Sequence, residues 1–291
     1  GVTGVQRVLF RSVVNDPASI QAGPSDLQAD LFDVVGRLGQ ITGMVKQVAG
    51  KALGNRGLQY QGRAQAAIGK VEAAFGDALE DLFTRVRSED RAALIAYIPA
   101  GFPTQDGCKK VIDAFIAGGV DAIEIGFPYS DPVMDGPTIQ AAADRALSQG
   151  TGAAEVFDAL KYATDKGIPS VVMTYWNPIE KYGVEKFADA IHSNGGSGVI
   201  TPDLTIEESS RWKSAVESSE INPIYVVAPS TTDARLDQVT SRCGGFIYAA
   251  SLMGVTGTRT SVSTGAADLV ARIRKSSKTP VAVGLGVSTR E

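Results

Sequence analysis

Short apolar segments recur along residues 92–291, and each is bounded by Gly, Pro or Asp. Short runs rich in β-branched residues are typical of strands that are buried on both faces of a parallel sheet. We therefore predict seven such strands. They are ALIAYIPA (93–100), VDAIEIGF (120–127), SVVMTYW (170–176), SGVITP (197–202), IYVVAP (224–229), GGFIYAA (244–250) and TPVAVGLG (279–286).

Amphipathic segments lie between these strands. In residues 104–119, Val111 and Phe115 stand at helical spacing before a Gly-Gly pair that predicts the end of a helix. Residues 184–196 and 265–277 follow the same plan. Strands and helices that alternate in this way predict a (β/α)8 barrel or a doubly wound sheet. Both folds place their active sites just after the carboxyl ends of the strands, where polar and glycine-rich residues cluster here.

Composition narrows the class of protein. The chain has 291 residues, 44% of them hydrophobic, and a net charge of −4, which is ordinary for a globular protein and argues against nucleic-acid binding. Cys108 and Cys243 form no disulfide framework or zinc pattern, which favours a reducing, cytoplasmic setting. No apolar run approaches the roughly 18 residues of a membrane span. The single histidine, His192, is expected at the end of a helix.

The segment DAIEIGFPYSDPVMDGPTIQ (121–140) carries the candidate chemistry. Alternation along a strand sends Ile123 and Ile125 to one face and Glu124 to the other, which in a barrel is the interior. An acid in partly apolar surroundings would have a raised pKa, which suits proton transfer near neutral pH. The alternative is a buried acid that is held by a backbone amide or an arginine.

The loop after this strand holds two further acids, Asp131 and Asp135, among three prolines that stiffen it. Either aspartate alone could be a plain turn residue. Two carboxylates held in different environments can take different proton-transfer roles.

Two glycine-containing loops follow later strands. Residues 251–261 include Thr256 and Gly257, and they are either a lid or simply a flexible loop. Gly284 and Gly286 follow the seventh strand, where many barrels bind phosphate through backbone N–H groups. A Gly-x-Gly pair alone is weak evidence for a phosphate site, but its position after the seventh strand strengthens that prediction.

Seven motifs stand in order along about residues 80–291. They are RAALIAYIPAGFPT, DAIEIGFPYSDPVMDGPTIQ, VVMTYWNPIEKYG, GVITPDLTIEES, VAPSTTDARL, YAASLMGVTGTR and VAVGLGVS. Together they resemble the tryptophan synthase alpha subunit family, of the actinobacterial type. The resemblance implies a (β/α)8 TIM barrel that cleaves indole-3-glycerol phosphate to indole and glyceraldehyde 3-phosphate.

The resemblance also implies roles for individual residues. Glu124 would move protons at the indole C3 and the glycerol hydroxyl, and Asp135 would take the indole N–H proton. The other residues that it implies contact the substrate; they are Tyr97, Tyr175, Tyr248, Thr256, Gly257, Gly284 and Gly286.

The same resemblance implies a partner. Family members work in an αββα complex, in which pyridoxal phosphate belongs to the beta subunit and the alpha chain needs no cofactor or metal. Asp131 and Asp203 match the surface that docks the beta subunit.

The sequence ends five residues after the seventh predicted strand. We therefore expect residues 81–291 to form a barrel that lacks its last βα unit and part of its phosphate site. Such a barrel would leave the edges of its first and seventh strands unpaired.

The amino-terminal residues differ from the barrel. Residues 34–80 resemble CsbD-like proteins, which are small hydrophilic stress-associated chains, and a generic amphipathic or disordered tail is the alternative. We expect residues 13–80 to form a helical or partly disordered segment. Residues 1–12 resemble the translation of a sequencing-library adapter and are expected to be a non-native leader.

Two other functions stay open at this point. One is a phosphosugar isomerase on a similar barrel, which would have no need for the loop with Asp131 and Asp135. The other is a non-catalytic fragment with a stress-associated amino-terminal module. Dependence of indole release on Glu124 separates both from the lyase.

Overall fold

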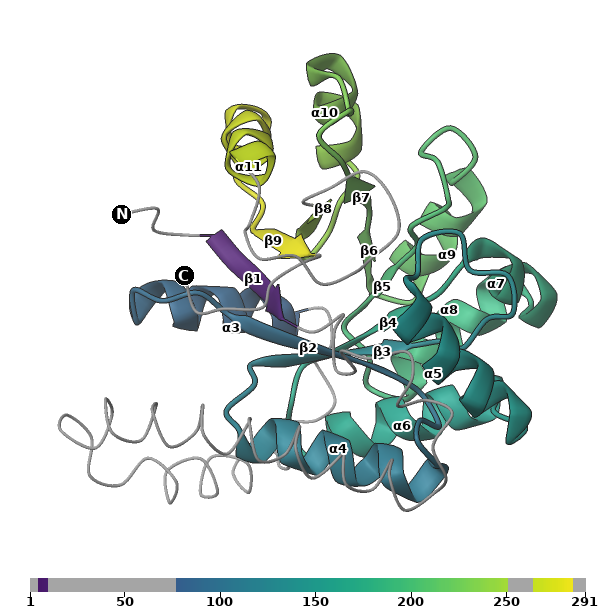
Figure 1. The fold of residues 1–291 in the computed structure, drawn as a ribbon. Coiled ribbons are helices and arrows are strands. Elements are labelled where there is room, and N and C mark those ends of the chain that lie inside the picture. The colour runs from purple at the N-terminus through teal and green to yellow at the C-terminus, as the bar shows by residue number, and fades with distance from the viewer. Residues whose placement is uncertain (1–4, 10–76, 251–263, 285–291) are drawn as a thin grey trace, which may run out of the picture.

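A computed structural model describes residues 5–9, 77–250 and 264–284, and the structural statements below concern these residues. Their strands form one parallel sheet in the order β6-β5-β4-β3-β2-β1-β9-β8-β7. The two ends of this order, β6 and β7, are separated in the chain by Tyr225 alone, so the sheet closes into a barrel (Figure 1). The strands are β1 (Val5–Leu9), β2 (Leu94–Pro99), β3 (Ala122–Gly126), β4 (Ser170–Met173), β5 (Gly198–Ile200), β6 (Asn222–Ile224), β7 (Val226–Val227), β8 (Ile247–Ala250) and β9 (Val281–Gly284).

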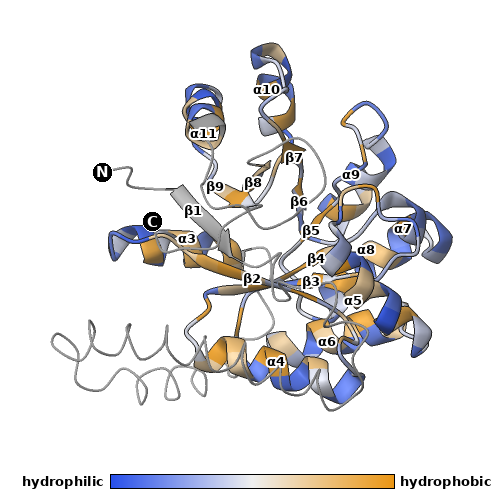
Figure 2. Ribbon diagram, viewed as in Figure 1, coloured by the Kyte–Doolittle hydropathy of each residue, from blue (hydrophilic) through white to orange (hydrophobic). Residues whose placement is uncertain are grey.

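Helices surround the barrel and turn their apolar faces toward it (Figure 2). None of the helices in the described ranges is long and apolar enough to cross a membrane. They are α3 (Asp77–Ser88), α4 (Gln105–Ala117), α5 (Pro137–Ser148), α6 (Ala153–Asp165), α7 (Trp176–Tyr182), α8 (Val184–Ser193), α9 (Ser210–Ser218), α10 (Asp233–Thr240) and α11 (Thr264–Ser276).

The core has an inner layer inside the barrel and an outer layer between the strands and the helices. Ile123 and Ile125 of β3 pack in the outer layer with Phe115 of α4. Ala122 of the same strand packs in the inner layer with Tyr97. Because side chains alternate along a strand, Glu124 shares the inner face with Ala122, which confirms the predicted alternation.

The seven predicted strands are confirmed. Each observed strand is shorter than the apolar run that predicted it. The fifth is divided by Tyr225 into β6 and β7, and it begins at Asn222 rather than at residue 224. The three predicted helices are α4, α8 and α11. His192 lies in the last turn of α8, as expected.

The expectation that the first and seventh predicted strands, β2 and β9, have unpaired edges is wrong. β1 lies between them and is parallel to both (Figure 1). Its register aligns Val8 with Ile95 of β2 and Val5 with Val281 of β9. Residues 5–9 therefore occupy a strand position of the barrel sheet, although they belong to the segment expected to be a non-native leader (1–12).

Helix α3 covers the end of the barrel at which the strands begin. Its Leu79 and Phe83 are buried in the inner core layer with Ile95, and the ring of Phe83 meets Phe246 edge-on at 5.8 Å. The expected domain boundary between residues 80 and 81 falls within this helix. Apart from β1, the described part of the barrel begins at Asp77.

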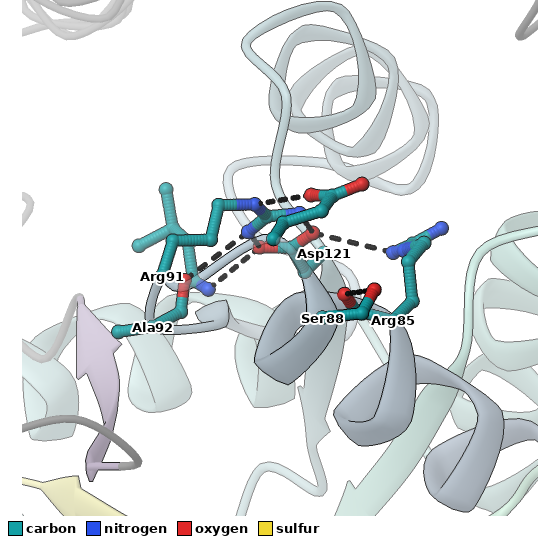
Figure 3. A network of polar contacts seen from close by, with 7 residues as sticks. Arg85, Ser88, Arg91, Ala92 and Asp121 are labelled. Carbon is teal, nitrogen blue, oxygen red and sulfur yellow. Dashed lines mark hydrogen bonds and ion pairs between the residues drawn. The ribbon is translucent and has the colours of Figure 1, made fainter.

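Asp121, the residue before β3, ties α3 to the sheet (Figure 3). Its carboxylate accepts hydrogen bonds from Arg91 Nη1 at 2.6 Å and Arg91 Nη2 at 2.8 Å, and from Arg85 Nη2 of α3 at 3.3 Å. The backbone N–H of Leu94 donates to it at 2.9 Å. Hydrogen bonding to Asp121 raises the pKa of the Arg91 guanidinium above its ordinary value.

Candidate active site

Glu124 lies inside the barrel as the middle residue of β3, two residues before the carboxyl end of the strand. Its register partners are Tyr97 on β2 and Val171 on β4, and only 1% of its surface is exposed. The carboxyl ends of parallel strands form the mouth of a barrel, so the carboxylate lies just below that mouth. A carboxylic acid at this depth is shielded from bulk water, which suits a group that exchanges protons with a bound substrate.

Asp135 is held by the loop that joins β3 to α5. It is buried, and Tyr175 donates a hydrogen bond from its hydroxyl to Asp135 Oδ2 at 3.1 Å. The same hydroxyl accepts the backbone N–H of Met134 at 3.1 Å. Gln140 Nε2 donates to the Asp135 carbonyl at 2.8 Å. These bonds hold the carboxylate and its backbone in place.

Two further contacts join this loop to the start of α7. The rings of Tyr129 and Tyr175 lie 5.4 Å apart, and Asn177 Nδ2 donates to the Tyr129 hydroxyl at 2.8 Å. The loop between β3 and α5 that carries Asp131 and Asp135, here called the acid loop, therefore packs on the segment that follows β4. Tyr129 and Asn177 were not among the predicted site residues, because nothing in the local sequence pairs them.

The two aspartates of the expected docking surface lie on the surface of the protein. Asp131 is exposed and accepts the Ser130 hydroxyl at 2.6 Å. Asp203 accepts the Trp176 N–H at the start of α7 with Oδ1 at 3.0 Å and Oδ2 at 3.1 Å. Desolvation raises the pKa of the Asp203 carboxyl, and the bond from Trp176 partly opposes this rise.

The predicted pocket tyrosines Tyr97 and Tyr248 both belong to the inner core layer. Tyr248 lies on β8, with Val226 of β7 and Ala282 of β9 as register partners. Its ring lies over Gly284, where an added methyl group would stand 2.1 Å from the Tyr248 hydroxyl oxygen. Gly284 therefore makes room for an aromatic ring, a steric role that the phosphate prediction did not include.

Three predicted site residues, Thr256, Gly257 and Gly286, lie outside the described residues, and so does the CsbD-like segment up to residue 76. Burial raises the pKa of the Cys108 thiol to about 11 and that of Cys243 to about 12, so neither forms a thiolate readily. Within the described ranges, no group of three or more His, Cys, Asp or Glu side chains is arranged to hold a metal ion.

The arrangement suits acid–base chemistry on an aromatic substrate. Glu124 lies inside the barrel, Asp135 is held at the mouth by Tyr175, and Tyr97 and Tyr248 add aromatic rings to the inner layer. Two carboxylates in different environments can act as separate proton donors and acceptors. Aromatic rings can pack against a flat, apolar substrate group.

The residues that form the barrel are similar in sequence to known proteins. The family model described as "Tryptophan synthase alpha chain" matches residues 83–291. The tryptophan synthase alpha chain of Streptomyces avermitilis is 51% identical over 214 residues, which are 73% of this chain and 77% of that protein. The protein of the same name from Thermobifida fusca is 52% identical over 205 residues, 69% of this chain and 76% of its own length.

Solved tryptophan synthase structures are also similar to this chain. A structure of Mycobacterium tuberculosis tryptophan synthase matches with a TM-score of 0.70 and 44% identity, and the match covers 73% of this chain and 81% of that one. A structure of the tryptophan synthase α2β2 complex from Pyrococcus furiosus matches with a TM-score of 0.64 and 35% identity, over 68% of this chain and 80% of that one.

Proposed function

The chain belongs to the tryptophan synthase alpha chain family, and we propose that its barrel cleaves indole-3-glycerol phosphate with Glu124 and Asp135 as the acid–base pair. The products are indole and glyceraldehyde 3-phosphate, which makes the chain a carbon–carbon lyase of tryptophan biosynthesis. The observation that carries the assignment of roles is the placement of Glu124, buried on the inner face of β3 below the mouth.

Glu124 moves protons on the side of the bond that breaks. It donates a proton to C3 of the indole ring, which turns that carbon into a site from which the side chain can leave. It takes the proton of the neighbouring glycerol hydroxyl, whose carbon becomes the aldehyde of glyceraldehyde 3-phosphate. One proton is given and one is taken, so the carboxyl group ends the cycle in its starting state.

Asp135 acts at the indole nitrogen. It accepts the N–H proton when C3 is protonated and returns it when the C–C bond breaks and the electron pair flows back into the ring. The hydrogen bond from Tyr175 to Oδ2 keeps this carboxylate in place. A positioned carboxylate is an effective base because its orientation is set before the reaction begins.

The other predicted residues have binding roles in this proposal. Tyr97, Tyr175 and Tyr248 surround the indole ring. Thr256 and Gly257 contact the substrate from the loop after β8, and Gly284 and Gly286 donate backbone N–H groups to its phosphate. We propose residues 81–291 as the catalytic domain, preceded by a CsbD-like segment (13–80) and a leader (1–12). The start of helix α3 at Asp77 and strand β1 (Val5–Leu9) come from these two preceding segments and pack into the barrel.

The proposal includes a partner and a location. The chain pairs with a tryptophan synthase beta subunit, which holds the pyridoxal phosphate of the complex, and Asp131 and Asp203 lie on the docking surface. The alpha chain itself uses no cofactor. The reaction belongs to cytoplasmic metabolism, where we place this chain.

Indole release from indole-3-glycerol phosphate tests the proposal, with the full chain and a tryptophan synthase beta subunit in the assay. Glu124→Gln keeps the shape of the side chain and removes its ability to exchange protons. We expect the loss of a catalytic acid–base to lower kcat by roughly 10²–10⁴-fold.

Glu80→Gln is the matched control, because it makes the same change at an exposed position on α3. It should release indole at the wild-type rate. A wild-type chain that releases no indole would refute the activity, and a Glu124→Gln variant as active as the control would refute the catalytic role of Glu124.

A further inference from the structure

Gly126, the last residue of β3, stands two residues beyond Glu124. Side chains two apart on a strand point to the same face, so position 126 faces the barrel interior directly above Glu124. Several glycines of the described chain have positive φ, including Gly101 at 75°, and Gly126 is not among them. The backbone conformation therefore does not require a glycine here, and the reason must be space.

The ring of Tyr97 fills that space. A methyl group on Gly126 would lie 2.3 Å from the Tyr97 hydroxyl oxygen, 2.6 Å from Cζ and 2.7 Å from Cε2. Non-bonded carbon atoms prefer separations of about 3.5–4.0 Å. Even the smallest side chain at position 126 is therefore incompatible with the position of this ring.

Tyr97 cannot move aside without disturbing the core. Only 7% of it is exposed, and it packs in the inner layer with Ile95 and Met173. An aromatic ring is rigid, so a push on its outer edge moves the whole ring. Close-packed interiors pass such displacements to the neighbouring side chains.

The register shows where the ring lies relative to the chemistry. Tyr97 pairs with Glu124 across β2 and β3, and its ring reaches diagonally forward to Gly126. The ring therefore lies beside Glu124, on the side toward the mouth of the barrel. A substrate group that approaches Glu124 along β2 and β3 from the mouth meets this ring.

The same geometry recurs on another pair of strands. Tyr248 on β8 pairs with Ala282 on β9, and its ring reaches forward to Gly284, two residues beyond that partner. A methyl group at Gly284 would lie 2.1 Å from the hydroxyl oxygen and 2.3 Å from Cζ of Tyr248. In both pairs, a tyrosine on one strand lies over a glycine at the carboxyl end of the next.

We propose that Gly126 is a positioning residue that sets the place of the Tyr97 ring and thereby the width of the indole pocket beside Glu124. The proposal rests on the proposed function, because it specifies how the same site holds the indole ring. Gly126 touches no reacting atom, and its contribution is the absence of a side chain.

Gly126→Ala tests this inference in the indole-release assay. The methyl group should push the ring of Tyr97 into the pocket, so we expect KM for indole-3-glycerol phosphate to rise roughly tenfold. The value of kcat should fall much less, because the hydrogen bonds that hold Asp135 do not involve Tyr97. Gly152→Ala is the matched control, since a methyl group there would meet only Glu155 Oε2 at an ordinary 3.7 Å.

A second substitution distinguishes a specific contact from general damage. Tyr97→Leu removes the ring, so adding Gly126→Ala to it should change KM by less than about twofold. Tyr97→Phe should give only partial relief, because Cζ stays while the hydroxyl oxygen is lost. If Gly126→Ala raises KM by the same factor in the Tyr97→Leu background as in the wild type, the inference is wrong.

Thermal unfolding gives a readout that does not depend on activity. Gly126→Ala should lower Tm by roughly 5 °C in the wild-type background and by far less beside Tyr97→Leu. Absence of indole release from the wild-type chain would refute the proposed function while this thermal cycle still tests the contact. Equal Tm and KM for Gly126→Ala and the wild type would refute the inference alone.

Discussion

Asp121 shows how one buried carboxylate joins three segments of the chain. It accepts hydrogen bonds from Arg91, from Arg85 on α3 and from the N–H of Leu94 at the start of β2. Asp121 is 4% exposed, whereas the side chains of Arg85 and Arg91 are 39% and 40% exposed. A buried acceptor that loses its charge leaves two cations and an amide with weaker partners.

We predict that Asp121→Asn lowers the free energy of unfolding by about 2 kcal/mol, a value reduced from that of a fully buried ion pair because the arginines are partly solvated. Urea unfolding followed by tryptophan fluorescence measures it. Asp158→Asn is the control, because Asp158 pairs with Lys109 at the surface and is 56% exposed. Equal losses in the two variants would mean that the Asp121 contacts add nothing beyond a surface pair.

The sequence predicted the direction of a side chain correctly where that direction depends on one strand alone. The inward direction of Glu124 follows from alternation with Ile123 and Ile125, and it required no knowledge of the other strands. The bond from Tyr175 to Asp135 joins residues 40 positions apart, so no local pattern could reveal it. The resemblance had placed both residues in the site without indicating this contact.

At the scale of elements, β1 is the main departure from the sequence-based expectation. Its segment, VQRVL, has Gln6 and Arg7 at its centre and does not form an apolar run like the other strands. Its position depends on the edges of β2 and β9, which lie far apart in the sequence. An unpaired sheet edge offers N–H and C=O groups to any extended segment that can reach it.

We predict that Val8→Pro destabilises the protein by roughly 2 kcal/mol, because a proline in a strand between two neighbours removes a ladder N–H and strains the pairing. Val8→Thr is the matched control, since it keeps both the N–H and a β-branched side chain. Chemical denaturation of the two variants makes the comparison. If they unfold at the same urea concentration, β1 contributes no pairing energy in solution.

At the scale of the whole molecule, the acid loop and α7 form one surface beside the mouth of the barrel. Tyr129 contacts Tyr175, and Asp203 holds the first N–H of α7. A partner that binds this surface would contact the loop that carries Asp135. The proposed docking surface and the proposed catalytic Asp135 therefore share these residues.

We predict that the chain forms a complex with a tryptophan synthase beta subunit and that Asp203→Asn weakens it roughly tenfold, because a charge on the docking surface is lost. Analytical ultracentrifugation or calorimetry gives the dissociation constant. Asp165→Asn on α6 is the control for the loss of an exposed carboxylate, which is 62% exposed there. An unchanged dissociation constant for Asp203→Asn would limit Asp203 to its contact with Trp176.

The sequence by itself determined the seven apolar strands, three of the helices (α4, α8 and α11) and the face on which Glu124 stands, because these features depend on periodicity within a few neighbouring residues. Tertiary structure alone decided the placement of β1, the contact of Tyr175 with Asp135 and the space above Gly126 that Tyr97 fills. Each of these joins positions on different strands or loops. Such contacts arise only when the closed sheet brings segments that are far apart in the sequence side by side.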